Sequence, residues 1–166
     1  MRMRTTHPTL VAAGKEQDLG RTEMESAPIP VRLTLNESTA AALAEAADDL
    51  CKACDADHFV AALDINHRLW LTLSRIASAK AWLDPNRHLA DFVVSASRTA
   101  GRGLSDDKLE ALVEINREVS KRLTSGRALS PIRQRAKLAW QERGRPYGVP
   151  LERWLIAEME RQAKAH

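Results

Sequence analysis

The chain has 166 residues, of which 44% are apolar but only 4% are aromatic, so alanine and leucine must supply most of a buried core. No run of residues approaches the roughly 18 apolar positions of a membrane-spanning helix. The apolar stretch near the N-terminus is too short for an export signal, which favours a cytoplasmic location. The net charge is +3, and the basic excess is confined to residues 127–166, which carry nine basic and four acidic side chains. This asymmetry predicts two units with different surfaces.

The first thirty residues lack hydrophobic periodicity and end in Pro28-Ile29-Pro30, so we expect a mobile N-terminal tail over residues 1–35. The short polar side chain of Asn36 can cap a helix, which predicts a helix over about 37–54. Asp48 and Asp49 are expected to point outward from it. The predicted buried stripe consists of Ala40, Leu43, Ala47 and Leu50.

The two cysteines, Cys51 and Cys54, have the C-x-x-C spacing of redox and zinc sites, and His58 is near enough in sequence to be a third ligand. A thioredoxin-like motif follows a strand, however, and a closed zinc site needs four ligands. Both cysteines also continue the apolar stripe of the first helix. The sequence therefore favours buried structural cysteines without a metal.

A second helix is predicted over about 58–82, capped by Asp55 or Asp57 and stopped by the turn at Asp84-Pro85. It is the longest predicted helix, and we expect the later helices to be arranged so that they cover its apolar face. That face has an asparagine inside it, and its spacing of three and four residues joins Phe59, Leu63, Asn66, Trp70, Leu73 and Ala77.

Two further helices are predicted between this one and residue 126. The first covers about 86–100, with Leu89, Phe92, Val93 and Ala96 on one face, and ends at Gly101. The second is capped by Ser105 and closed by Ser125-Gly126. Its apolar stripe also contains an asparagine and consists of Leu109, Leu112, Val113, Asn116, Val119 and Leu123.

A C-terminal helical hairpin is predicted from Ser130-Pro131 onward, with a cap and a first-turn proline opening its first helix. The loop Gly144–Gly148 separates this helix from a last helix that begins near Pro150. Because no alternating β pattern is present, the fold class is all-α. We predict a bundle of about four helices over 36–126 with an appended basic hairpin over 127–166.

Asn66 and Asn116 allow two interpretations. In one, the two amides bond to each other or to helix ends inside the bundle and fix its register. In the other, they line a groove and bind a partner's backbone. Trp70, on the same face as Asn66, belongs either to the core or to the border of such a groove, where an amphipathic helix could dock.

The basic C-terminal segment could contact phosphates of a nucleic acid, since arginine suits that role. The residues that would do so include Arg133, Arg135, Lys137, Arg143 and Arg145. The alternative is that these charges form ordinary solvated helix faces.

No catalytic motif is recognisable. Asp64, His67 and Arg68 lie together in sequence, but adjacent residues such as His67 and Arg68 do not share a helix face, and no phosphate-binding loop or HExxH motif occurs. The sequence therefore predicts a protein that is not an enzyme and needs no cofactor or metal.

Two motifs resemble FlaF, a family of flagellar biosynthesis regulators of α-proteobacteria. The stretch from Ala62 to Trp70 is similar to the family's Ala-Leu-x-x-Asn-x-x-Leu-Trp signature, and Leu112 to Arg117 is similar to its Leu-Ile-x-Ile-Asn-Arg motif. The resemblance covers about 36–126 in the right order. It departs from the family at Leu71-Thr72-Leu73, where FlaF usually has an aromatic residue, and this chain is longer than the usual member.

The resemblance implies a small helical protein that promotes flagellin synthesis or secretion by contacting flagellin, and that works alongside the translational regulator FlbT. The positions that carry over as partner-binding residues are Asn66, Leu69, Trp70, Asn116 and Arg117.

The C-terminal part resembles a second, uncharacterised family of small helical hairpins over about 130–160. Its pattern is Arg-x-x-Ala-x-x-x-Trp, then Gly-Arg-Pro-x-Gly, then Trp-x-x-Ala-Glu, which this chain matches from Arg133 to Glu158. This likeness implies no activity. It is consistent with Trp140 and Trp154 packing across the hairpin. In the alternative function, RNA binding, the basic residues of this segment would make the contacts.

Overall fold

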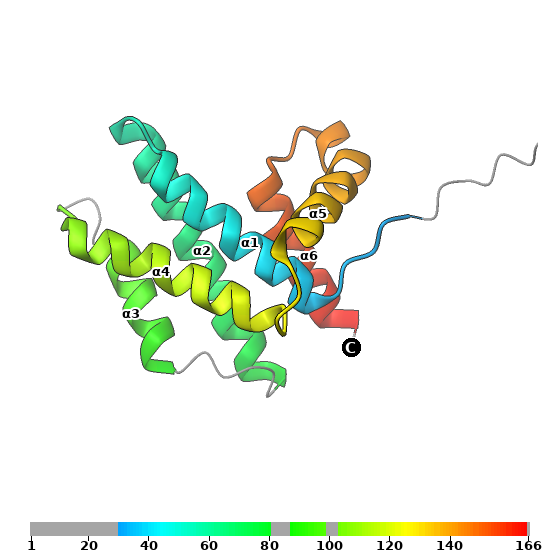
Figure 1. The fold of residues 1–166 in the computed structure, drawn as a ribbon, viewed down its shortest axis with the longest axis horizontal. Helices are drawn as coiled ribbons and strands as arrows, with labels where there is room; N and C mark the ends of the chain where they lie inside the picture. Colours follow the sequence, from blue (N-terminus) through cyan, green and yellow to red (C-terminus); the bar gives the residue numbers. More distant parts are fainter. Residues whose placement is uncertain (1–29, 81–86, 99–102, 166) are drawn as a thin grey trace, which may run out of the picture.

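The computed structural model describes residues 30–80, 87–98 and 103–165, and this part of the chain contains helices and no strand (Figure 1). The all-α prediction is therefore confirmed. The predicted tail over 1–29 and the expected helix ends at Trp82, Asn86 and Ala100 lie outside the described residues. The elements are α1 (Leu35–Lys52), α2 (Ala56–Lys80), α3 (Arg87–Arg98), α4 (Asp106–Leu123), α5 (Leu129–Arg143), the 3₁₀ turn η2 (Arg145–Tyr147) and α6 (Leu151–Ala165).

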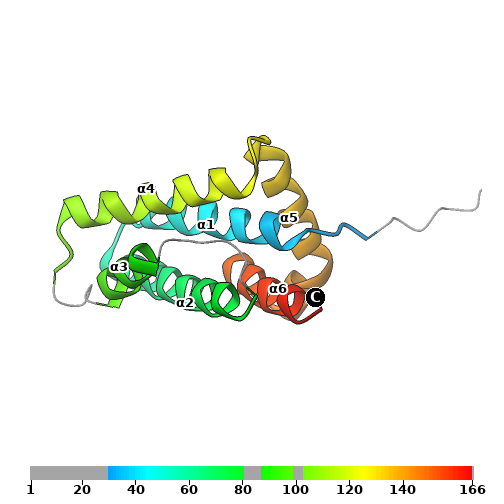
Figure 2. The same cartoon turned by 90° about the horizontal axis from the view of Figure 1, so that it is seen from below.

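The helix at the centre of the molecule is α1, and not the longer α2 that the sequence suggested. It contacts α2, α4, α5 and α6, and Figure 2 shows α4 along one side and α2 with α6 along the other. Alanine makes this position possible, since its small side chain lets neighbouring helices approach from several directions. The alanines of α1 that are buried are Ala40, Ala41, Ala42, Ala44, Ala46 and Ala47.

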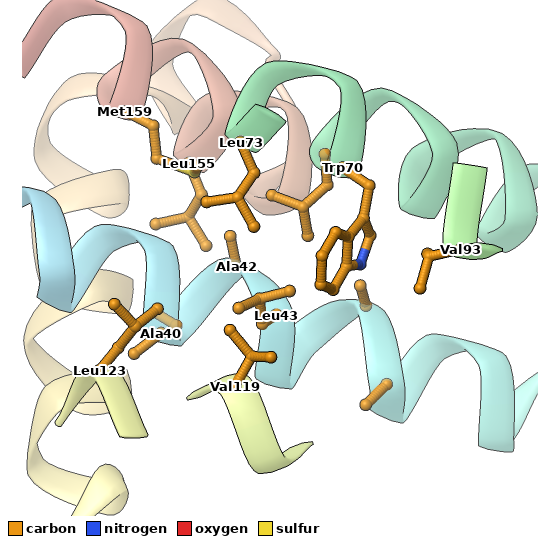
Figure 3. Close-up of a cluster of buried hydrophobic side chains, with 14 of the residues drawn as sticks. Ala40, Ala42, Leu43, Trp70, Leu73, Val93, Val119, Leu123, Leu155 and Met159 are labelled. Atoms are coloured by element: carbon orange, nitrogen blue, oxygen red, sulfur yellow. The ribbon is translucent and has the colours of Figure 1, made fainter. Parts of the chain in front are cut away.

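One hydrophobic core joins all six helices (Figure 3). Trp70 from α2 and Val93 from α3 point toward α1 from one side. Leu155 from α6 is completely buried in the same cluster. A fully buried leucine stabilises the fold by about 1.5–3 kcal/mol relative to an exposed one. The hairpin formed by α5 and α6 thus contributes to the core that it shares with the other four helices.

Local hydrogen bonds explain where α1 begins. Thr34, and not Asn36, is its cap: the Thr34 hydroxyl accepts a bond from the Glu37 backbone N–H, and the Glu37 carboxylate accepts one from the Thr34 N–H. This is a capping box, which satisfies two N–H groups that would otherwise lack a partner.

The caps of the later helices also depart partly from expectation. Asp55 caps α2 through its bond from the His58 N–H, as one of the two predicted alternatives. Ser105 lies at the N-cap of α4 but makes no side-chain cap bond. α5 begins at Leu129, so the predicted cap Ser130 lies within the helix. Its neighbour Pro131 is tolerated because first-turn N–H groups need no partner in the helix.

The segment before α1 is packed against the C-terminal hairpin. Leu33 is buried, its carbonyl accepts a 2.8 Å bond from Gln162 Nε2, and the Val31 carbonyl accepts a 2.6 Å bond from Arg143 Nη2. The expectation of a mobile tail as far as residue 35 is therefore wrong for residues 31–35. The missed signal was the Thr34-x-x-Glu37 spacing, which places the start of α1 earlier.

The hairpin turn is built around Gly144. A Cβ atom added to it would lie 2.6 Å from Cδ1 of both Trp140 and Trp154, so both indole rings occupy the space that a side chain would need. Trp140 Nε1 donates to the Val149 carbonyl at 2.7 Å. The predicted packing of the two tryptophans at this turn is confirmed.

Several side chains differ from the predicted pattern. Phe92 is 40% exposed although it was expected on the apolar face of α3. Asp48 and Asp49 are partly buried because α1 is surrounded by other helices. None of the helices in the described ranges combines the length and apolarity required to cross a bilayer.

Candidate functional site

Asn66 and Asn116 meet inside the bundle. Asn116 Nδ2 donates to Asn66 Oδ1 at 2.7 Å, and Asn116 Oδ1 accepts a 2.7 Å bond from Trp70 Nε1. Asn66 Nδ2 donates to Ser97 Oγ at 2.9 Å. The chain of bonds thus links α2, α3 and α4, and we call these four residues the amide network. It confirms the interpretation in which the two amides bond to each other.

All four residues of the amide network are buried. Asn66, Asn116 and Trp70 are each 0% exposed, and Leu69 is 1% exposed. Of the five residues that the resemblance marks for partner binding, Arg117 alone is exposed. The idea of a groove lined by the two amides is therefore wrong for this conformation, since all polar atoms of the pair face one another or Trp70 and Ser97. Their role here is to fix how three helices pack.

Ser97 is the member of the network that the sequence analysis missed. It follows Val93 by four residues, so it continues the apolar face of α3. A small hydroxyl residue at such a position is a weak signal, because serine is also common on exposed helix faces.

Three of the nine basic residues in 127–166 pair with carboxylates of α1. Arg133 binds Glu45 at 2.9 Å and Asp48 at 2.8 Å. Arg135 binds Glu37 at 2.5 Å, and Arg127 reaches the same oxygen at 3.1 Å. The opposite net charges of the two parts of the chain thus meet within the molecule.

Glu37 explains why these pairs matter. Its side chain is 4% exposed, and burial pushes its pKa upward, but the Thr34 N–H and the guanidinium groups of Arg135 and Arg127 outweigh burial and hold the pKa below its ordinary value. The carboxylate therefore stays charged, and a buried charge requires such partners.

The three other predicted phosphate contacts are Lys137, Arg143 and Arg145, and Arg143 is the one among them that is engaged within the fold. Arg143 bonds to the Val31 carbonyl, lies 4.0 Å from Glu158, and stacks over Trp154 at 5.6 Å. Lys137 and Arg145 are exposed. Of the five predicted phosphate contacts, Arg133, Arg135 and Arg143 are thus engaged within the fold, and Lys137 and Arg145 are exposed.

A pocket of about 590 Å³ lies where the end of α1, the start of α2 and the start of α6 come together. Cys54 and His58 are in its wall, with Ala62, Ile65 and Pro150 as the apolar part. The remaining lining residues are Asp49, Lys52, Ala53, Ala61, Asp64, Glu152 and Arg153.

Asp49 is the perturbed group of this pocket. Burial raises its pKa to about 6, and the nearby negative charges of Glu152 and Glu45 contribute in the same direction. A carboxyl with such a pKa changes charge close to neutral pH. The sequence signal for it was absent, because Glu152 reaches Asp49 only through the packing of α6 on α1.

The cysteines are exposed, and the prediction that they are buried is wrong. Cys51 lies in the last turn of α1, and Cys54 lies in the short link between α1 and α2. Cys51 Sγ accepts a 3.7 Å bond from Arg117 Nη2, whereas Cys54 Sγ lies 3.8 Å from Asp55 Oδ2. The two thiols therefore face different groups.

No family model, curated protein or solved structure matches the chain.

Proposed function

We propose that this chain is a non-enzymatic regulator of flagellar biosynthesis resembling FlaF, which promotes flagellin synthesis or secretion by binding flagellin as an export-chaperone-like partner in the cytoplasm. The observation that carries the proposal is the amide network. The residues that define the two motifs, Asn66, Trp70 and Asn116, form one buried hydrogen-bonded unit. Motif residues that depend on each other in this way support a shared fold.

The finer architecture belongs to the same proposal. In it, residues 36–126 are the FlaF-like part, a bundle of the four helices α1 to α4, and residues 127–166 are an added hairpin. The ion pairs from Arg127, Arg133 and Arg135 to α1 support a bracing role for the hairpin. They count against the rival view that its arginines bind RNA, because a guanidinium paired with a carboxylate is less available to a phosphate.

Flagellin would have to contact exposed residues, since the motif positions are buried. Val60 and Leu71 are 57% and 45% exposed, and both lie on α2. Their separation of eleven residues places them about 20° apart around the helix and about 16 Å apart along it. That spacing fits the apolar stripe of an amphipathic helix lying alongside α2.

The partner segment is therefore proposed to be an amphipathic helix of flagellin, whose apolar face would otherwise drive premature association. Binding of this apolar face to α2 would shield it from solvent and keep flagellin competent for export. FlbT would act beside this complex at the level of translation.

Calorimetric titration of the full chain with purified flagellin tests the proposal. We expect a complex whose affinity falls at least about tenfold when Val60→Asp and Leu71→Asp are combined, because two apolar anchors become charged. The matched control is Leu138→Asp, which changes a leucine of α5 that is 50% exposed and is expected to alter affinity by less than about twofold.

Absence of a complex with the unaltered chain would refute flagellin binding. Equal losses from the α2 double variant and from Leu138→Asp would refute the assignment to α2. Circular dichroism of each variant establishes that the helices are retained.

A further inference from the structure

Cys54, Asp55 and His58 form a group of potential metal ligands at the corner between α1 and α2. Their ligand atoms all lie within 4.8 Å of one another, and all three residues are exposed. The group consists of a thiol, a carboxylate and an imidazole, which is a mixed donor set and not a cluster of acidic residues. Such a set suits Zn²⁺ and neighbouring first-row metals better than Mg²⁺ or Ca²⁺, which prefer oxygen ligands.

The two oxygens of Asp55 have separate tasks. Oδ1 accepts the 2.8 Å bond from the His58 N–H that caps α2. Oδ2 lies 2.5 Å from His58 Nδ1 and 3.8 Å from Cys54 Sγ. The cap thus holds the carboxylate in place while Oδ2 faces both other donors, so little rearrangement is needed to bring three ligands to one ion.

The pocket beside these residues provides the room that a metal site needs. Cys54 and His58 are part of its wall, and Asp49 and Glu152 are carboxylate residues that also line it. An ion held by three ligands at the pocket edge keeps a coordination position for water or for an anionic group that enters the pocket.

We propose that Cys54, Asp55 and His58 bind a transition-metal dication of the zinc type at the entrance to this pocket. The binding is independent of flagellin. Cys51 is not a ligand, because its thiol is directed toward Arg117 of α4. Coordination releases the proton of the Cys54 thiol and joins the link that follows α1 to the first turn of α2.

Titration of the full, chelator-treated chain with Co²⁺ tests this site, since thiolate coordination gives a sulfur-to-cobalt charge-transfer band in the near ultraviolet. We expect this band in the unaltered chain and its bleaching by Zn²⁺. Cys54→Ser should abolish the band, and His58→Gln should weaken binding at least about tenfold. Asp55→Asn is the conservative variant, because asparagine retains the cap of α2 while removing the charged ligand.

Cys51→Ser is the matched control, with the same chemical change three residues away, and it should keep both band and affinity. A second readout is the thermal midpoint, which should rise with Zn²⁺ in the unaltered chain and in Cys51→Ser but not in Cys54→Ser. The proposal is overturned if the unaltered chain shows no thiolate band, if the band persists in Cys54→Ser, or if Cys51→Ser abolishes it.

Discussion

Replacing Asn116 by alanine removes the centre of the amide network. Two groups then lose their partners at once, Trp70 Nε1 and Asn66 Oδ1, and both residues are completely buried. Each buried polar group left without a hydrogen bond costs about 1–3 kcal/mol, so the expected loss in the free energy of unfolding is about 2–6 kcal/mol. A domain of this size has about 5–15 kcal/mol in total, so the loss is a large fraction of its stability.

Urea denaturation followed by circular dichroism and tryptophan fluorescence measures this loss. The control is Arg117→Ala, on the next residue of α4, which is exposed and lies 3.9 Å from Asp48; it should change stability by less than about 0.5 kcal/mol. A double-mutant cycle of Asn66→Ala with Asn116→Ala should give a coupling energy of about 0.5–3 kcal/mol. If Asn116→Ala were as mild as Arg117→Ala, or if the two asparagine changes were additive, the reasoning about the network would be refuted.

Two further predictions concern a pocket residue, Asp49, and the hairpin turn at Gly144. Asp49 has a pKa of about 6 in the folded state and an ordinary value of 3.8. The folded chain therefore binds the proton more tightly than the unfolded chain, and this group's contribution to stability decreases as pH rises from about 4 to 6. Asp49→Asn should then stabilise the protein by about 1–2 kcal/mol at pH near 7.5 and by much less at pH near 4, after allowance for solvent screening; urea midpoints at the two pH values check this, and an equal effect at both would contradict it. Gly144→Ala should destabilise the fold by about 1–3 kcal/mol, because the new methyl group would collide with Trp140 and Trp154. Thermal unfolding measures the effect, and an unchanged midpoint would show that the rings can move aside.

The helices and their approximate limits in the described ranges could be predicted because hydrophobic periodicity, glycines and prolines act locally, although Asn36 and Ser130 were wrong as caps. The Asn66–Asn116 contact could also be anticipated, since an amide inside an apolar stripe requires a polar partner and each stripe contained one. The position of α1 could not be read in the same way. Its alanines are small on every side, so its sequence shows no single strongly apolar face, and only the packing of later helices reveals that it is surrounded.

The ion pairs between distant parts of the chain could not be predicted from the sequence either. Nothing local connects Arg135 with Glu37, which are 98 residues apart, and the basic excess of the C-terminal segment therefore resembled a solvent-facing or nucleic-acid-binding surface. The exposure of Cys51 and Cys54 has the same origin. Their spacing continues the stripe of α1, but Cys51 lies in the last turn of α1 and Cys54 lies beyond its end, and both are exposed.

The central place of α1 has a consequence for synthesis on the ribosome. The helix is translated before every other described helix, yet its enclosure requires α6, which is translated last among the described elements. Until then its alanine-rich surface and the Glu37 carboxylate lack part of their cover, and the nascent protein must keep an unfinished interior while more than a hundred residues are added. A fold built this way completes its native packing only after α6 has been translated, and not progressively from α1 onward.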